Sequence, residues 1–335
     1  MRAQVHLQAP SSRSLDAAEV TPLLVYDHDK PHMVGTVLVA FAAVAFSLVA
    51  TYVKYISVDL TSVEATFWRF GVAYAFVLIL ALYSKVDLLV APQYHWDLAW
   101  RCVFGTASVL SFFWAITQMA LADASTIAAT SPVVVSLVGV WLRREPVGLV
   151  DIVTAAVAVA GIVFVARPNV VFEVPIISYG SPYACLGAVG SAVFVALANA
   201  HVQKLSAVPT LVVTHYLLLV GATISGIWVL VAQGRFSLHG CGRTVAQATI
   251  ASGLVAFLGD LALSKGLQQL EHPDTSTRTN RLLSMVQYVD LAFVFLWDVT
   301  LIHERVNWWS VLGAVLVTAA VVTVHYRRAT RASNE

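Results

Sequence analysis

Charged residues are scarce in this chain. Asp, Glu, Lys and Arg make up 12% of its 335 residues, whereas hydrophobic residues make up 59%. Soluble domains usually carry about 25% charged residues. A water-soluble fold of this length could not bury so much apolar surface, so we expect lipid to surround most of the chain. The net charge of +1 gives no reason to expect nucleic acid as a partner.

Metal-binding, nucleotide-binding and catalytic motifs are also missing. The three cysteines, Cys102, Cys185 and Cys241, are far apart and form no CxxC pair, so we expect neither a metal site nor a disulfide. No G-x-x-x-x-G-K-[ST] loop occurs, which argues against a self-contained ATP-driven pump. The sequence has no H-x-x-x-x-D, H-E-x-x-H or G-x-S-x-G motif of a membrane acyltransferase or protease. We therefore expect no enzyme and no bound cofactor.

Long apolar segments account for most of what is present. A helix needs about 20 residues to cross the hydrocarbon core of a bilayer. The least certain of the candidate segments is the ninth, which Asp290 and Asp298 interrupt. The ten candidate spans are 33–56, 63–83, 100–121, 124–142, 147–166, 182–204, 209–232, 246–268, 281–302 and 306–326.

The distribution of Lys and Arg predicts the orientation in the membrane. With ten spans, both tails lie on one side, and most of the 20 Lys and Arg residues lie on that side too. Such a positive side is typically cytosolic. We thus expect a flexible cytosolic N-terminal tail, 1–32, and a short cytosolic C-terminal tail, 327–335.

The N-terminal tail contains one recognisable pattern. It lacks the apolar stretch of a cleaved signal peptide. Glu19, Leu23 and Leu24 are spaced as in an acidic dileucine sorting signal, which clathrin adaptors read. The pattern predicts delivery to a lysosome, vacuole or other endomembrane, and the plasma membrane is the alternative.

The two halves of the chain echo each other weakly. The sequence REPV at 144–147 precedes one apolar span, and HERV at 303–306 precedes another about half a chain later. Five spans per half would make the halves insert in opposite directions, as in many secondary transporters. We therefore predict an all-α polytopic protein with two inverted five-helix repeats, 33–166 and 182–326, joined by a loop at 167–181 and enclosing a central cavity.

Several stretches resemble one known family. The segment LADASTIAATSPVVVSLVGVWLRREP (121–146), followed by GIVFVARP (161–168), resembles the EamA type of the drug/metabolite transporter superfamily. The segments SLVATYVKYI (47–56), TFWRF (66–70), GSAVFVALANAHVQKL (190–205) and VDLAFVFLWDVTLIHERVNWWSVLGAVLV (289–317) resemble type G of solute carrier family 35 in particular. The resemblance implies a ten-helix bundle with alternating access, driven by gradients or exchange. Substrates in the family include nucleotide sugars, organic anions, amino acids and drugs. For type G, the resemblance suggests organic anions such as citrate.

Embedded basic residues are the first candidates for solute contact, because a charge in the hydrocarbon region normally faces a cavity or a partner. Arg69 lies within the second span, where its guanidinium could clamp a carboxylate or phosphate. The alternatives are extension to the membrane surface or an ion pair with Glu64. Lys54, near the outer end of the first span, could add to a positive outer half of the cavity or extend to the surface. Together they favour an anionic solute.

Embedded acids and one histidine are candidates for coupling or gating. Asp290 could take up a proton, orient a basic residue or contact the solute, or it could form a structural pair. Asp260 needs a partner outside its own helix face, or a proton. His215 could relay protons, although such a histidine is more often simply hydrogen-bonded. We expect Asp298, close to the outer end of the ninth span, to be interfacial.

Other polar and small residues have weaker signals. Pro132 predicts a kink in the fourth span, which could then line a cavity or merely pack. The Ala156–Ala160 ridge suggests close helix packing, either within the bundle or in a homodimer. A secondary transporter is the favoured function, and a non-transporting receptor or scaffold is the alternative. Aromatic and amide groups that could orient a solute, or simply join helices, are Trp114, Gln118, Asn199, Gln287 and Tyr288.

Overall fold

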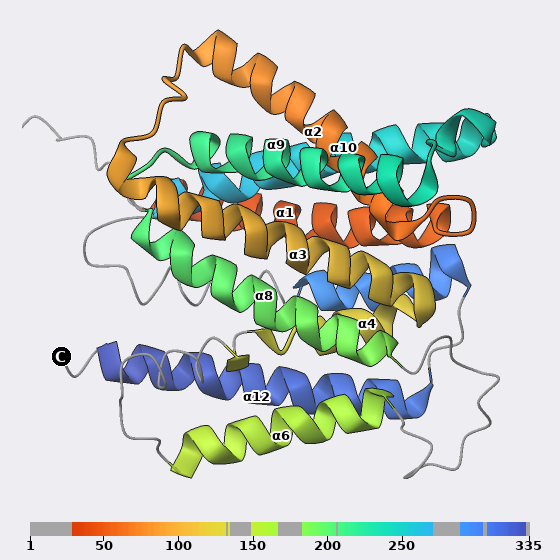
Figure 1. Ribbon diagram of the computed structural model, residues 1–335. Coiled ribbons are helices and arrows are strands. Elements are labelled where there is room, and N and C mark those ends of the chain that lie inside the picture. Colours follow the sequence, from red (N-terminus) through yellow and green to blue (C-terminus); the bar gives the residue numbers. More distant parts are fainter. Residues whose placement is uncertain are drawn as a thin grey trace, which may run out of the picture.

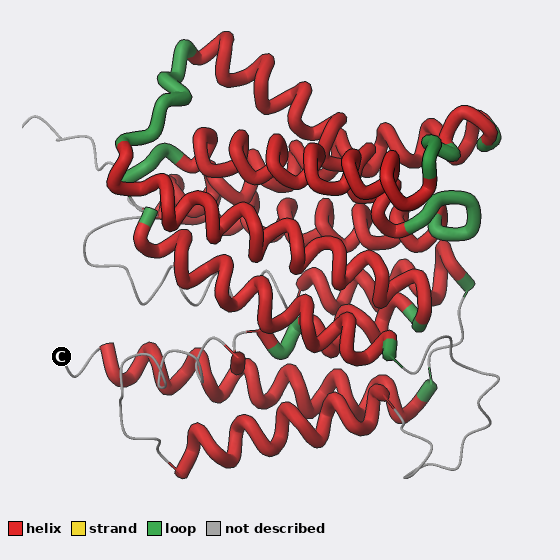
Figure 2. The backbone as a smooth tube through the Cα atoms, in the orientation of Figure 1, coloured by secondary structure: helices red, strands yellow, loops and turns green. Residues whose placement is uncertain are grey.

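The fold is a bundle of helices in every part of the chain that is described (Figures 1 and 2). The computed structural model describes residues 29–131, 133–134, 149–166, 183–205, 207–270, 289–303 and 307–332. These residues form helices, turns and loops, and none of them forms a strand. Six predicted site residues lie outside the described residues: Glu19, Leu23, Leu24, Pro132, Gln287 and Tyr288.

The helix boundaries follow the apolar segments closely, because a helix satisfies its own backbone hydrogen bonds where lipid offers none. A segment at 289–297 is also helical and continues into the π-helical turn η5, Asp298–Ile302. The larger helices are α1 (Asp29–Ile56), α2 (Ser62–Ser84), α3 (His95–Gln118), α4 (Leu121–Ala128), α6 (Leu149–Ala166), α8 (Ala184–Lys204), α9 (Thr210–Trp228), α10 (Arg243–Leu270) and α12 (Trp308–Ala332).

Within the described residues, six helical segments are long and apolar enough to cross a membrane. This agrees with the prediction of an all-α polytopic membrane protein. The α6 and α12 helices contain shorter apolar segments, Ile152–Val165 and Trp308–Thr323. The six spans are Val37–Ile56, Ser62–Ser84, Pro92–Gln118, Ala184–His201, Thr210–Gln233 and Arg243–Leu263.

The α4 helix differs from the continuous helix predicted over 124–142. It begins at Leu121 and ends at Ala128, and a turn follows at Ala129 and Thr130. A longer helix would need the backbone N–H of residue 132 to bond to the carbonyl of Ala128. Residue 132 is a proline, which has no N–H and whose ring would clash with that carbonyl. The first half of the predicted span is therefore a short helix that ends at Ala128, and residues 131, 133 and 134 are helical again after the turn.

The helices pack in pairs that join distant parts of the sequence. Extensive contacts connect α1 with α10, α3 with α8, α2 with α9 and α6 with α12. Smaller contacts connect α2 with α10, α3 with α9 and α4 with α8. Figure 1 shows α6 and α12 side by side along one edge of the bundle.

Two glycines allow α6 and α12 to approach closely. A Cβ atom on Gly313 would lie only 2.7 Å from the backbone oxygen of Gly161 and 2.5 Å from Cγ2 of Val165. Small residues permit this kind of backbone contact between membrane helices. Ala156, on the predicted packing ridge, is exposed instead. The close contact therefore runs through Gly161 and Gly313.

Glu64 anchors the connection between α9 and α10 to the start of α2. Its side chain is 0% exposed. The Oε1 atom accepts hydrogen bonds from the backbone N–H groups of Ser237 (2.8 Å) and Leu238 (3.0 Å) and from Nε1 of Trp68 (3.3 Å). Oε2 has no hydrogen-bond partner among the described residues, so the alternative in which Glu64 pairs with Arg69 is not found there.

Candidate functional site

The described helices line a cavity of about 260 Å³. Its wall comes from α1, α2, α3, α4, α8 and the 289–297 helix, so both halves of the sequence contribute. Phe46, Phe112 and Phe113 supply aromatic surface. An apolar cavity with a few convergent polar groups is the usual form of a small-molecule site. The polar residues in its wall are Arg69, Ser108, Ser125, Ser131, Ser191 and Asp290.

Arg69 is held inside the bundle, where it lines the cavity. Its guanidinium carbon lies 5.5 Å from the centre of the Phe113 ring and 5.4 Å from that of the Phe70 ring. These are distances at which an aromatic face attracts a cation. Among the described residues, the Nε atom of Arg69 has no hydrogen-bond partner. The side chain is therefore not extended to the membrane surface, and it has a donor to offer.

Asp260 is the electrostatic neighbour of Arg69. The carboxylate on α10 interacts favourably with Arg69 on α2 and with Arg101 on α3. About two turns before Asp260, the α10 helix can approach α2 closely because residue 253 is glycine. A Cβ there would lie 2.6 Å from Cβ of Val72 and 3.2 Å from the carbonyl oxygen of Arg69. Asp260 does not line the cavity. Its attraction for Arg69 helps to hold the charge of that arginine within the bundle.

Asp290 lines the same cavity from the second half of the chain. Within the described residues, its carboxylate has neither a hydrogen-bond partner nor an ion-pair partner. The hydroxyl of Ser125, a residue that is only 6% exposed, also lacks a partner there. By contrast, Ser108 Oγ donates to the carbonyl of Ser191 at 3.1 Å. The cavity therefore presents one cation, one anion and one hydroxyl without hydrogen-bond partners in the described structure.

Lys54 lies away from this cavity. Its Nζ donates to the carbonyl of Met119 at 2.8 Å, where α3 ends. Just beyond, the backbone N–H of Ala122 donates to Oδ2 of Asp298 at 3.0 Å. Asp298 is 1% exposed, so protein covers its side chain. It is buried because it accepts a hydrogen bond from the first turn of α4, whose N–H groups have no partner within the helix.

The other predicted residues that are described also lie outside the cavity wall. Trp114 packs on α8, where a Cβ on Gly187 would lie 2.6 Å from its Cε3 atom. Gln118 donates weakly to Thr117 Oγ1 at 3.4 Å, and Asn199 is exposed. His215 is 6% exposed and packs against the rings of Tyr74 and Tyr216. The structure thus brings Arg69 and Asp290 together and leaves Lys54, Trp114, Gln118, Asn199 and His215 elsewhere.

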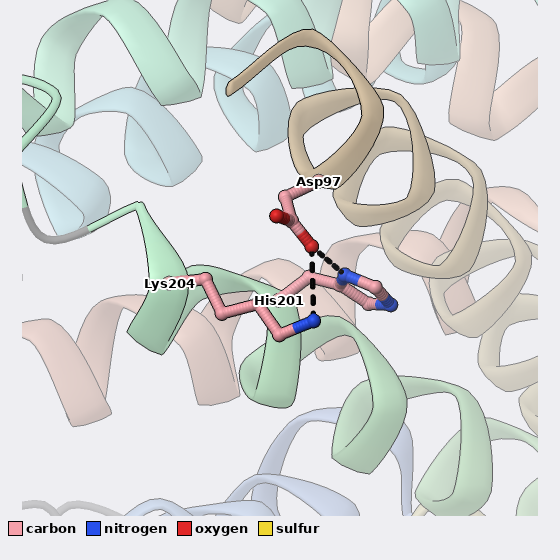
Figure 3. A network of polar contacts seen from close by, with 3 residues as sticks. All are labelled: Asp97, His201 and Lys204. Carbon is pink, nitrogen blue, oxygen red and sulfur yellow. Dashed lines mark hydrogen bonds and ion pairs between the residues drawn. The ribbon is translucent and has the colours of Figure 1, made fainter. Parts of the chain in front are cut away.

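A second polar cluster joins the first turn of α3 to the last turn of α8 (Figure 3). Oδ1 of Asp97 contacts Nδ1 of His201 at 2.8 Å and Nζ of Lys204 at 3.2 Å. His201 also stacks on Phe104, with ring centres 5.9 Å apart. None of these residues is among the sequence-predicted site residues. The available signal was the spacing of His201 and Lys204, which puts both on one helix face.

Comparisons with known proteins agree on one kind of protein. Residues 33–167 match the EamA-like transporter family. Solute carrier family 35 member G1 of Mus musculus is 25% identical, over 88% of this chain and 77% of that protein. The pseudopaline exporter CntI of Pseudomonas aeruginosa (strain UCBPP-PA14) is 26% identical, over 87% of this chain and 95% of that protein. A solved crystal structure has the same fold, with a TM-score of 0.57 at 17% identity, over 88% of this chain and 96% of that one.

Proposed function

We infer that this chain, a membrane transporter whose residues 33–167 form an EamA-like transporter domain, is a secondary transporter or exchanger. In this proposal it moves a small organic solute with an anionic group by alternating access. The relatives are named as a solute carrier and an exporter, which implies transport and not catalysis. The sequence has no phosphate-binding loop for ATP, which favours a gradient or an exchange as the energy source.

The helix packing supports two related halves. In chain order, the first half contributes α1, α2, α3, α4 and α6, and the second contributes α8, α9, α10, the 289–297 helix and α12. The first helix of each half packs against the third helix of the other, as α1 with α10 and α8 with α3. The second helices pack together, as do the last ones. Exchanging the halves leaves this pattern unchanged, as expected for an inverted repeat.

Arg69 in the cavity wall is the observation that carries the proposal. Its planar guanidinium matches the geometry of a carboxylate or phosphate. The Phe113 ring and the electrostatic attraction of Asp260 offset part of the cost of burying its charge inside the bundle. A solute anion could then bind to donors that are already in place, with little cost of reorganisation.

Counterflow in sealed proteoliposomes tests this function. Purified protein would be reconstituted with unlabelled citrate, glutarate or an amino acid inside, and the uptake of the same labelled compound would be measured. We expect saturable uptake of at least one compound above that of protein-free liposomes. A receptor or scaffold would bind a compound without exchanging it across the membrane. Binding without exchange would therefore contradict transport and favour that alternative.

The N-terminal segment carries a separate prediction about location. We propose that Glu19, Leu23 and Leu24 direct the protein through a clathrin adaptor to an endomembrane, with both termini cytosolic. Replacing Leu23 and Leu24 by alanine should move a fluorescently tagged full-length protein to the cell surface, because the adaptor would lose its apolar contacts. Replacing Val20 by alanine, within the same segment, should leave the location unchanged. An unchanged location of the dileucine variant would refute the sorting role.

A further inference from the structure

The cavity presents groups of both signs, and we propose that its solute carries a carboxylate and a protonated amine, as an amino acid does. Arg69 would bind the carboxylate, and Asp290 would bind the amine. This inference rests on the proposed transport function and narrows its solute to zwitterions. It also assigns Asp290 to solute contact, in preference to proton uptake or the orientation of a basic residue.

The amine half of the proposal depends on Asp290. Its carboxylate lines the cavity and has no hydrogen-bond or ion-pair partner within the described part of the chain. A carboxylate within the membrane-spanning part of a bundle is unfavourable without a partner. Arg69 already has an electrostatic partner in Asp260, which is outside the cavity. A cationic group of the solute would therefore give Asp290 the partner that the described protein does not.

The carboxylate half depends on Arg69 and Ser125. Arg69 Nε and Ser125 Oγ are both buried without a hydrogen-bond partner among the described residues, and both residues line the cavity. Each can donate to a carboxylate oxygen. A hydrogen bond to a charged group is stronger than one between neutral groups, whereas a buried donor left unpaired is destabilising. A bound carboxylate would remove both penalties.

The charge balance favours a zwitterion over an anion. Arg69 and Asp290 are the two charged residues of the described cavity wall, and their charges sum to zero when both are ionised. A zwitterion keeps this sum at zero. A dicarboxylate would add two negative charges in a region of low dielectric, and a diamine would add two positive ones. The volume of about 260 Å³ is at the small end for ligand sites, which suits a compound of amino-acid size.

Matched probes can isolate each charge of the solute. Binding to purified full-length protein in detergent would be measured by thermal shift and titration with glycine, β-alanine, γ-aminobutyrate and δ-aminovalerate, in which the charges are increasingly far apart. Valerate lacks only the amine of δ-aminovalerate, and glutarate and cadaverine replace one charged end by the other. We expect at least one amino acid to bind about tenfold or more tightly than its matched anion, diacid or diamine.

Two variants assign the ends of the solute. Asp290→Asn should weaken binding of the preferred amino acid by about tenfold or more and leave binding of its matched monocarboxylate unchanged. Arg69→Gln should weaken both. The inference is overturned if no amino acid binds, if a dicarboxylate binds better than every amino acid, or if Asp290→Asn binds the amino acid as the unaltered protein does. Unchanged amino-acid binding with loss of pH-driven accumulation would instead assign Asp290 to proton coupling.

Flux separates this inference from the proposed function. If amino acids bind but are not exchanged in proteoliposomes, transport is contradicted and the solute class stands. If dicarboxylates are exchanged while no amino acid binds, transport stands and the zwitterion inference fails.

Discussion

Replacing Arg69 by glutamine should reduce solute uptake into proteoliposomes by roughly 10- to 100-fold while the protein still inserts and folds. The expected loss corresponds to one hydrogen-bonded contact with a charged group, about 1.5–3 kcal/mol. Arg69 lines the cavity and has an unpartnered Nε donor among the described residues. Uptake should be measured as an initial rate, normalised to the amount of folded protein recovered by size-exclusion chromatography.

The neighbouring Asp260 complicates this test and also provides its control. Removing Arg69 takes away one of the two cations that attract the Asp260 carboxylate, and a buried charge without its partner can cost about 3–5 kcal/mol. The Arg69→Gln, Asp260→Asn double variant removes both charges together. We expect it to regain thermal stability but not uptake, whereas Arg235→Gln, at an exposed site, should change neither. Normal uptake by the folded double variant would show that Arg69 does not bind the solute.

Replacing Glu64 by alanine should lower the thermal stability of the protein in detergent strongly. The substitution would leave two backbone N–H groups, of Ser237 and Leu238, and the indole of Trp68 without their acceptor. Each unpaired buried donor costs about 1–3 kcal/mol. A loss of about 3 kcal/mol or more is expected, and it would appear as a fall of several degrees in the melting temperature.

Glutamine at position 64 is the matched control, because its amide oxygen can accept the same hydrogen bonds that Oε1 of Glu64 accepts. We expect Glu64→Gln to be much closer in stability to the unaltered protein than Glu64→Ala. Limited proteolysis near residues 234–242 should show the same order, since this connection is the segment that Glu64 anchors. Equal melting temperatures for Glu64→Ala and the unaltered protein would contradict the anchoring role.

The long helices could be predicted from the sequence because their physical cause is local. An apolar stretch of membrane-spanning length must form a helix, and the boundaries of α2 and α8 fall within about two residues of the predicted spans. The α4 helix was harder, since the extent of a proline's effect depends on the carbonyl four residues before it. The sequence showed that Pro132 would disturb the helix but not that the helix would end at Ala128.

The site was predictable only in part. The cost of an embedded charge singled out Arg69 and Asp290, and both line the cavity. The same argument could not distinguish them from Lys54 and Asp298, which bond to the connection between α3 and α4. These partners are distant in sequence and are main-chain groups, so no side-chain pattern reveals them. Ser125 was not among the predicted site residues, because a hydroxyl in a membrane helix usually bonds to its own backbone.

The proposed alternating access of the cavity can be tested most directly at Ser125, which lines it and is 6% exposed. Ser125→Cys would be placed in a background without Cys102, Cys185 and Cys241, and labelled in sealed vesicles with a small membrane-impermeant thiol reagent applied to one face at a time. We predict labelling from either face, slowed by a bound solute, and none at Ile152→Cys on the outer surface of α6. Labelling of residue 125 from one face only, or from neither face, in protein that remains folded, would contradict the account.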